Sequence, residues 1–230
     1  MRDKMITAEE AAAMIKDGST VMVGGFMSNG TPEILMDALV ARNAKDLTVI
    51  CNDGGTGPSF DENGNETKAA TGNGKLIQNH CVKKLIATHI GLNKQVAEQM
   101  NSGQLEVELV PQGSMAEKIR AGGAGLGGVL TPTGVGTDVA EGKETLNING
   151  KDYLLEMPLH ADFAVLRGNI VDKKGNVYYH NTTKNFQTVM ATAADTVIVA
   201  AEKIVEVGEL DPNYVMTPYI FVDYIVGGEK

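Results

Sequence analysis

One stretch of the chain, residues 17–32 (DGSTVMVGGFMSNGTP), constrains the fold more than any other. Within it, Thr20–Val23 is short and mostly apolar, and turn residues stand on both sides of it, which predicts a buried strand. Gly24 and Gly25 follow at once, and Gly30 comes shortly after. Glycines at the end of a strand predict a tight turn in which no side chain covers the backbone.

The same stretch predicts where a helix begins. Thr31 is the expected N-cap and Pro32 the first helical residue, because proline lacks the N–H that would be unpaired there. A glycine turn before a helix brings bare backbone N–H groups near a ligand, with the positive end of the helix dipole behind them. In an open α/β sheet, ligands bind at this edge.

The rest of the chain repeats the alternation of helix and strand. Thr7 and Glu10 form a capping box that predicts the start of a helix over residues 7–16. Further helices are expected at residues 32–42, 94–102, 114–120 and 185–194. Further strands are expected at residues 47–51, 82–88, 105–110, 163–167, 196–200 and 220–226. This order predicts an α/β fold, an open three-layer, mostly parallel sheet with helices on both faces.

Several segments depart from this alternation. Residues 52–74 are polar and rich in turn residues; residues 54–58 are expected to be ordered near a site, and residues 60–68 to be a flexible insertion. Residues 121–136 (AGGAGLGGVLTPTGVG) are expected to form a glycine-dense loop. A small β-hairpin portion is predicted around the turn Asn149-Gly150, and a second turn at residues 172–176. Because no linker divides the chain, residues 1–230 are expected to form a single domain.

Charge and composition narrow the class of protein. The formal net charge is −9, and no basic stripe typical of a nucleic-acid binder is visible. Cys51 and Cys81 are expected to be buried, reduced thiols. The N-terminal segment lacks the apolar core of a signal peptide, and no apolar run approaches the roughly 18 residues of a membrane span. These features predict a soluble, cytoplasmic protein with no membrane partner.

Three loops that follow strands, residues 24–30, 52–58 and 111–113, are expected to line one cleft, because the carboxyl ends of parallel strands share an edge. Residues 123–128 match G-x-G-x-x-G, but a helix precedes them and no helix start follows, so they do not predict a dinucleotide site. The four histidines are scattered, which predicts no metal site. The cleft has no evident nucleophile or base, which suggests a site completed by another chain.

Ordered blocks along the chain carry a resemblance. Gly-Gly-Phe-x-x-x-Gly-x-Pro at residues 24–32 resembles the opening signature of the alpha subunit of family I coenzyme A transferases. The similarity continues through later blocks, at residues 105–113 (LEVELVPQG), 116–125 (AEKIRAGGAG), 130–137 (LTPTGVGT), 168–177 (GNIVDKKGNV) and 183–186 (TKNF). The blocks look most like bacterial acetate/acetoacetate and butyrate–acetoacetate transferases, relative to which residues 60–68 look inserted.

This resemblance implies a ping-pong exchange of coenzyme A between a short-chain acyl-CoA and a free carboxylate such as acetate, acetoacetate or butyrate. It implies a nucleophilic glutamate on a beta subunit, which becomes a glutamyl-CoA thioester, and therefore no catalytic nucleophile on this chain. Coenzyme A is then a substrate, and no cofactor is expected. The implied assembly is α2β2.

The resemblance also implies site residues. Gln112 matches a glutamine of the acyl pocket, where its amide would donate to the substrate oxygen, and Asn52 matches an asparagine with a similar role. Gly24, Gly25 and Phe26 would shape the pocket wall, together with Gly30. The alternatives are structural: Gln112 only caps a turn, or Gly24 and Gly25 only form a tight turn with Phe26 in the core. Residues 122–128 would be a close-packing loop at the site or at a subunit interface.

Two other functions compete with this one. A sugar-phosphate isomerase of related fold would need its own acid and base on this chain, and the sequence shows no such set. A non-catalytic ligand-sensing domain would need an attached DNA-binding segment, and the N-terminal helix is too short and too acidic for that role.

Overall fold

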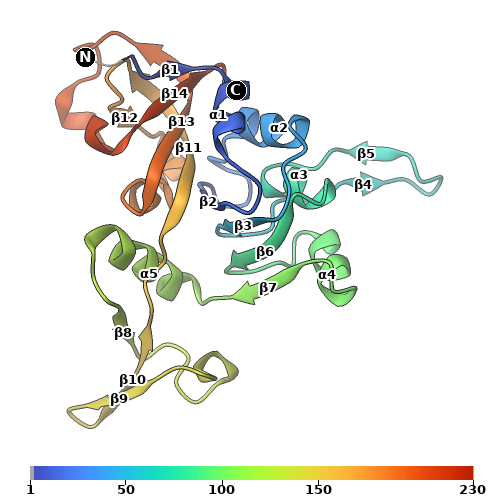
Figure 1. Cartoon of the computed structure of the whole chain (residues 1–230), viewed down its shortest axis with the longest axis vertical. Helices are drawn as coiled ribbons and strands as arrows, with labels where there is room; N and C mark the ends of the chain where they lie inside the picture. The colour runs from blue at the N-terminus through green and yellow to red at the C-terminus, as the bar shows by residue number, and fades with distance from the viewer. Residues whose placement is uncertain (1–2, 230) are drawn as a thin grey trace.

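The computed structural model describes residues 3 to 229. Its centre is a nine-stranded sheet in the order β1-β14-β13-β11-β2-β3-β6-β7, in which all these neighbours pair in parallel and β12 pairs antiparallel with β11 (Figure 1). The strands are β1 (Met5–Ile6), β2 (Thr20–Val23), β3 (Leu47–Ile50), β6 (Val82–Ala87), β7 (Glu106–Leu109), β11 (Ala161–Asp172), β12 (Val177–Tyr178), β13 (Ala194–Val205) and β14 (Tyr224–Gly227). The predicted open, mostly parallel sheet is confirmed.

Helices cover both faces of this sheet. They are α1 (Ala8–Met14), α2 (Glu33–Ala41), α3 (Asn73–Gln78), α4 (Lys94–Asn101), α5 (Gln112–Ala124) and α6 (Gln187–Met190), with short 3-10 turns at Asp138–Ala140, Asn181–Lys184, Pro212–Tyr214 and Tyr219–Phe221. One apolar core packs α1 to α4 against the sheet, and a second packs α5 and α6 against the opposite face. Successive strand residues alternate between the two cores: Val21 and Val23 lie in the first, and Met22 lies in the second.

The chain order places a topological switch beside β2. From β2 the sheet grows outward through β3, β6 and β7, and the chain then returns to place β11 and β13 on the other side of β2. Crevices in open α/β sheets form at such a reversal, at the carboxyl ends of the strands. The glycine turn that follows β2 therefore lies where a binding crevice is expected.

The capping box predicted for the first helix is present. Glu10 N donates to Thr7 Oγ1 (3.1 Å), and Thr7 N donates to Glu10 Oε2 (2.8 Å). The helix begins at Ala8, and β1 precedes it, a strand that the sequence did not indicate. The predicted single domain also spans Met1, Arg2 and Lys230, which lie outside the described residues.

We expect Thr7→Ala to lower the free energy of unfolding by about 1 kcal/mol, because the N–H of Glu10 loses its acceptor at the helix start. Urea unfolding of the purified chain measures the change. Thr7→Ser, which keeps the hydroxyl, is the matched control and is expected to stay close to wild type. Equal losses in both variants would contradict the capping role.

The second helix begins differently from the prediction. Its N-cap is Pro32, with no side-chain capping bond, and Glu33 is its first residue. Thr31 does not cap the helix. The N–H of Ile34 is instead bound by Glu229 Oε2 (3.0 Å), from the other end of the chain. A carboxylate at a helix N-terminus also interacts favourably with the helix dipole, so the tertiary contact replaces the local cap.

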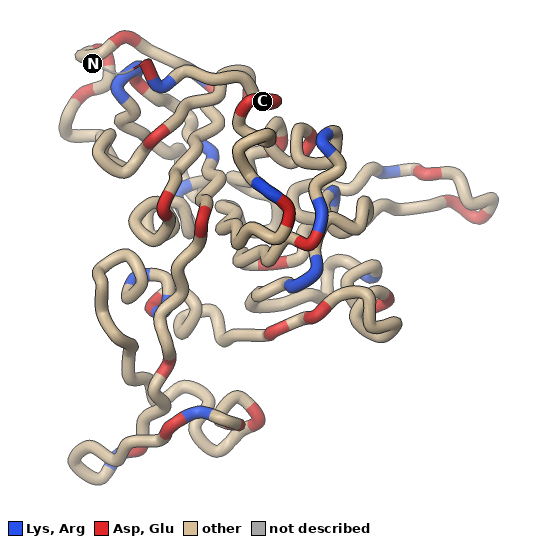
Figure 2. Tube along the Cα trace, viewed as in Figure 1, with Lys and Arg blue, Asp and Glu red and all other residues tan. Residues whose placement is uncertain are grey.

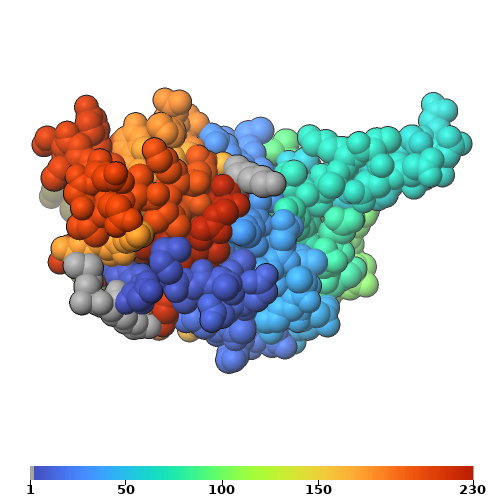
Figure 3. Space-filling model, turned by 90° about the horizontal axis from the view of Figure 1, so that it is seen from above, coloured from blue at the N-terminus to red at the C-terminus, as the bar shows by residue number. Residues whose placement is uncertain are grey.

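The segment predicted as one long polar loop contains regular structure. Ser59–Phe60 (β4) and Glu66–Lys68 (β5) pair as an antiparallel hairpin, and α3 follows. Both strands are exposed, and the hairpin projects from the body in two perpendicular views (Figures 1 and 3).

Two helices differ from their predicted lengths. Residues 121–124 belong to α5 rather than to a glycine-dense loop, and Gly125, with φ +68°, ends the helix in the left-handed conformation. The helix expected at residues 185–194 is reduced to α6, because Asn185 adopts a non-helical backbone and β13 already begins at Ala194.

A second, three-stranded sheet stands away from the main one (Figure 1). It consists of β8 (Val129–Thr131), β9 (Thr145–Ile148) and β10 (Lys151–Glu156), and it contains the predicted Asn149-Gly150 hairpin. Its junction with α5 holds the buried Glu156, which pairs with Lys118 (3.3 Å) and Lys143 (2.6 Å).

Figure 2 shows that Lys and Arg are spread over the trace rather than gathered along one stripe.

Candidate functional site

The turn after β2 has the backbone that its glycines predict, and two residues that are not glycine share it. Phe26 and Asn29 exchange backbone hydrogen bonds (3.0 and 2.9 Å). Met27 (φ +51°) and Ser28 (φ +63°) between them are both left-handed, as in a type I′ turn. This conformation is unfavourable for residues that carry a Cβ, so the turn persists only if its surroundings hold it.

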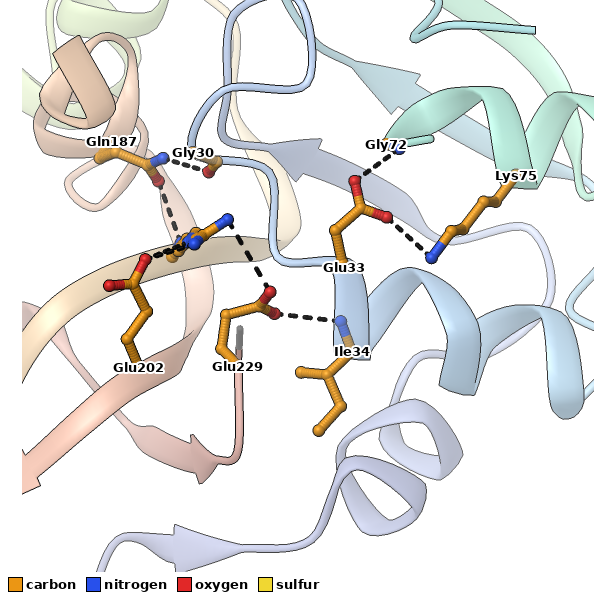
Figure 4. Close-up of polar contacts among 9 residues, drawn as sticks. Gly30, Glu33, Ile34, Gly72, Lys75, Gln187, Glu202 and Glu229 are labelled. Carbon is orange, nitrogen blue, oxygen red and sulfur yellow. Dashed lines mark hydrogen bonds and ion pairs between the residues drawn. The ribbon is translucent and has the colours of Figure 1, made fainter. Parts of the chain in front are cut away.

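Two side chains, Asn185 just before α6 and Gln187 at its first position, hold one side of this turn. Asn185 Oδ1 accepts from Gly25 N (3.2 Å), and its Nδ2 donates to Asn29 O (3.0 Å). The fully buried Gln187 donates from Nε2 to Gly30 O (2.6 Å), as Figure 4 shows. A Cβ at Gly24 would lie 2.1 Å from Gln187 Oε1, so a glycine is required for this close approach.

The helix that follows the turn is anchored by carboxylates (Figure 4). Glu33 Oε1 accepts from Gly72 N (2.7 Å), and its Oε2 pairs with Lys75 (2.8 Å). Burial acts to lower the pKa of Lys75, but the carboxylates of Asp37 and Glu33 outweigh it and hold the pKa above its usual value. Lys75 therefore stays charged, and it ties α3 to the first turns of α2.

The carboxylate of Glu229, which binds the N–H of Ile34, belongs to a second ion cluster. Its Oε1 lies 3.9 Å from the guanidinium of Arg167, which also pairs with Glu202. Glu229 thus links Arg167 of β11, and through it Glu202 of β13, to the start of α2, the helix that follows the turn after β2.

Two predicted site residues meet across the carboxyl edge of the sheet. Asn52, which is 1% exposed, follows β3, and Gln112 is the first residue of α5. Gln112 Nε2 donates to Asn52 Oδ1 (2.6 Å) although 60 positions separate them. Gln112 itself is exposed, so the buried amide of Asn52 fixes the amide of Gln112 at the surface.

A groove of about 340 Å³ opens beside Gln112. Its lining residues come from the turn after β2, from α5 and from the segment around α6: Phe26, Gln112, Gly113, Ala116, Arg120, Asn185, Phe186 and Val189. Phe26 and Gln112 were predicted at the site, and the structure brings both to this groove. Gly24, Gly25, Gly30 and Asn52 lie behind the wall instead of on its surface.

Of the three loops expected to converge, the first and third meet at the groove, whereas no residue of the second lines it, and its first residues, Asn52 and Asp53, support the groove from behind. Asp53 Oδ2 accepts from Met27 N (2.7 Å), which joins the loop after β3 to the turn after β2. Residues 56–58 instead line a separate cavity beside α4.

Sequence reasoning assigned no role to Asn185, Gln187 or Asp53. Asn185 lies in the block TKNF, which carried part of the resemblance, and Asp53 precedes Gly-Gly, a pattern typical of a side chain that bonds its own turn. The signal for Gln187 is absent from the sequence, because its partners Gly30 and Arg167 are distant in the chain.

The chemistry that the groove offers is polar but not nucleophilic. Of the lining residues, Arg120 alone carries a titratable side chain, and it pairs with Glu117 (3.1 Å). Burial raises the pKa of the Cys51 thiol beneath the site, so this thiol stays protonated. The groove can donate hydrogen bonds to an oxygen but provides no attacking group from the residues that line it.

Two further findings concern the described part of the chain. Within residues 3–229, His, Cys, Asp and Glu side chains form no cluster of three or more that could hold a metal ion. In the same range no helix is both long and apolar enough to cross a membrane.

A crevice at the switch point of a parallel sheet, lined by amide donors, defines a binding site of the α/β type. Residues 5–228 match the sequence model of the family described as coenzyme A transferase, and the chain belongs to that family. This finding confirms the resemblance that the sequence blocks indicated.

Particular relatives match over nearly their whole length. The chain is 49% identical over 226 residues to the acetoacetyl-CoA:acetate/butyrate CoA transferase alpha subunit of Clostridium acetobutylicum, covering 98% of each chain. It is 46% identical over 230 residues to the acetate CoA-transferase subunit alpha of Escherichia coli, covering 100% of this chain and 99% of the relative.

Solved structures share the fold. An acyl-CoA transferase from E. coli O157:H7, in a thioester complex with CoA, superimposes with a TM-score of 0.81 at 22% identity. The match covers 99% of this chain, which spans about half (47%) of that longer chain. Glutaconate coenzyme A-transferase from Acidaminococcus fermentans gives a TM-score of 0.82 at 19% identity, covering 98% of this chain and 76% of the other.

Proposed function

We propose that this chain is the alpha subunit of a heteromeric CoA transferase that moves coenzyme A between a short-chain acyl-CoA and a free carboxylate such as acetate, acetoacetate or butyrate. The observation that carries the proposal is the pair Gln112–Asn52 at the rim of a groove whose lining includes no carboxylate. Such a site can polarise an acyl oxygen but needs its nucleophile from another chain.

The proposed chemistry begins with a glutamate of the beta subunit. Its carboxylate attacks the thioester carbonyl carbon, the C–S bond breaks, and an acyl-glutamyl anhydride and CoA thiolate result. The thiolate then attacks the glutamyl carbonyl and releases the first carboxylate. The acceptor carboxylate attacks the carbonyl carbon of the glutamyl-CoA thioester, which releases CoA thiolate and forms a second acyl-glutamyl anhydride. The thiolate then attacks the acyl carbonyl of this anhydride, which gives the new acyl-CoA and the free glutamate. One thioester replaces another, so coenzyme A acts as a substrate and no cofactor is required.

Gln112 is the proposed donor to the acyl oxygen. One of its two amide hydrogens binds Asn52, and the second is available to an oxygen in the groove. Negative charge builds on the acyl oxygen as the tetrahedral intermediate forms, so a fixed donor there stabilises the transition state more than the bound substrate. Phe26, Ala116 and Val189 provide apolar wall for a short acyl chain.

The arrangement does not favour the two rival functions. An isomerase would need an acid and a base beside its substrate, and the lining of this groove contains no carboxylate or histidine. A sensing domain would not need two amides aligned at 2.6 Å beside an exposed groove.

The test is CoA exchange between acetoacetyl-CoA and acetate, measured with this chain alone, with its beta subunit alone and with both. We expect exchange in the mixture only, because the groove and the glutamate lie on different chains. Replacing acetate with butyrate then ranks the acceptors. Exchange by this chain alone would contradict the proposal, and so would an assembled mixture that exchanges no CoA with any short-chain acid.

A further inference from the structure

The loop after β3 contains a buried carboxylate that the proposed chemistry has not used. Asp53 is 3% exposed and lies directly after Asn52. Its Oδ2 accepts from Met27 N (2.7 Å) and from Asn52 Nδ2 (2.8 Å), and its Oδ1 accepts from Gly55 N (2.9 Å). The two donors on Oδ2 come from the turn after β2 and from the amide that holds Gln112.

We propose that Asp53 is a positioning residue that fixes the direction of both site amides, Asn52 and Gln112, and locks the turn after β2 to them. This inference rests on the proposed function, in which Gln112 donates to the acyl oxygen. Asp53 itself lies behind the groove wall and is not among the residues that line it.

An amide side chain has two orientations, and a neighbouring carboxylate selects one of them. Carboxylate oxygens only accept hydrogen bonds, so Asn52 must turn its NH2 group toward Asp53. Its Oδ1 must then face the other way, where it accepts from Gln112 Nε2 (2.6 Å) and from Thr88 Oγ1 (3.2 Å).

The orientation of Asn52 in turn sets the orientation of Gln112. Because Asn52 presents an oxygen, Gln112 must present its NH2 group, which sets which end of this exposed amide faces the protein and which faces the groove. Without Asp53, nothing fixes this direction, because the reversed chain of amides, with both groups rotated by half a turn, would also be satisfied. The charge of Asp53 also polarises the chain in the direction that strengthens the Asn52–Gln112 bond.

Asp53 also holds the turn after β2. Met27 is left-handed, with φ +51°, and its N–H is held by the same oxygen that holds Asn52. Phe26, the preceding residue, lines the groove together with Gln112. One carboxylate therefore sets the groove wall and the donor amide relative to each other.

The test uses two replacements that separate the local turn from the amide chain. In Asp53→Ser, the hydroxyl can still accept from the N–H of Gly55, as in an ST turn, but it is too short to reach Asn52 Nδ2. In Asp53→Asn, the side-chain amide can keep its oxygen toward both Asn52 and Met27, whereas its NH2 group cannot accept from the N–H of Gly55, so only the bond of the local turn is lost. The assays use the enzyme assembled with its beta subunit, acetoacetyl-CoA and acetate.

We expect Asp53→Ser to lower kcat by about tenfold while the KM for acetate changes by less than about threefold, because a misdirected donor affects the transition state most. Asp53→Asn is expected to stay within about threefold of wild type. In an Asn52→Ala background, Asp53→Ser should cause no further loss of kcat, because the amide through which it acts is gone.

Two kinetic results would overturn the inference: wild-type kcat in Asp53→Ser, or the same fold-loss in the Asn52→Ala background. If Asp53→Ser does not assemble, Asp53→Thr makes the same turn bond, fills more of the space and replaces it. A neutron crystal structure of the variant gives a readout without activity, because it distinguishes amide nitrogen from amide oxygen. The amides of Asn52 and Gln112 should be reversed or mixed in orientation, and retention of the wild-type orientation by both would also overturn the inference. A wild-type complex without CoA exchange would instead refute the proposed function, and the crystal structure would still decide the positioning role.

Discussion

Replacing Gln112 with alanine is expected to lower kcat for CoA exchange by about 10²- to 10³-fold, the loss typical of removing one fixed donor to a developing oxyanion. The side chain is exposed, and among the described residues it hydrogen-bonds to Asn52 alone, so the fold of the variant should be intact. The KM for the carboxylate should change less than kcat, because the donor contributes most when charge has built up on the acyl oxygen. Steady-state kinetics of the assembled enzyme measure both constants.

Gln104→Ala is the matched control for this substitution. Gln104 is also exposed, and it lies before β7, outside the residues that line the groove. We expect it to leave kcat within about twofold of wild type, as surface substitutions remote from a site usually do. If Gln112→Ala and Gln104→Ala gave the same kinetics, Gln112 would have no role in the exchange, and its contact with Asn52 would be a structural one.

The second large effect is expected at Gly122, inside α5. Replacing a helical glycine with alanine normally stabilises a protein by about 0.5–1 kcal/mol. Here the new Cβ would lie 2.0 Å from Leu159 O. That carbonyl belongs to the backbone and cannot move aside freely, because Leu159 N donates to Lys118 O on the same helix (2.9 Å). We expect Gly122→Ala to lower the free energy of unfolding by about 3 kcal/mol, the range of severe overpacking.

Gly113→Ala, in the same helix, is expected to raise the free energy of unfolding, since a Cβ there would meet nothing within 4 Å. Urea unfolding of the two purified variants should therefore shift in opposite directions from wild type. A Gly122→Ala variant as stable as wild type would show that α5 can move away from Leu159, and the close approach would then not be required by the fold. Loss of stability in Gly113→Ala as well would mean that alanine at either position disturbs the start or the packing of α5.

The elements that the sequence predicted correctly are those whose signal is local. The strand at Thr20–Val23, the capping box at Thr7 and the Asn149-Gly150 hairpin each depend on neighbouring residues, and all three are present. The wrong predictions share the opposite cause. Thr31 is not the N-cap because Glu229 supplies the bond. Gly122 lies inside α5 rather than in a loop, and it is a glycine because the backbone of Leu159 approaches too closely for a Cβ.

The residues of the candidate site also fall into those that the sequence predicted and those that it did not. Gln112, Asn52 and Phe26 were predicted because their blocks resemble a family, and the structure places all three around one edge of the sheet. Asp53, Asn185 and Gln187 were not predicted to act together, since their partners lie far away in the chain.

The sequence by itself determined that this chain forms a parallel α/β sheet with a glycine turn after its strand at Thr20–Val23, and it indicated the family. Periodicity, glycine turns and short motifs are properties of neighbouring residues, so they can be read directly. Only the tertiary structure decided which side chains hold that turn and which way the amides of Asn52 and Gln112 point. Those choices depend on hydrogen bonds between distant segments, whose partners become neighbours only when the sheet has formed.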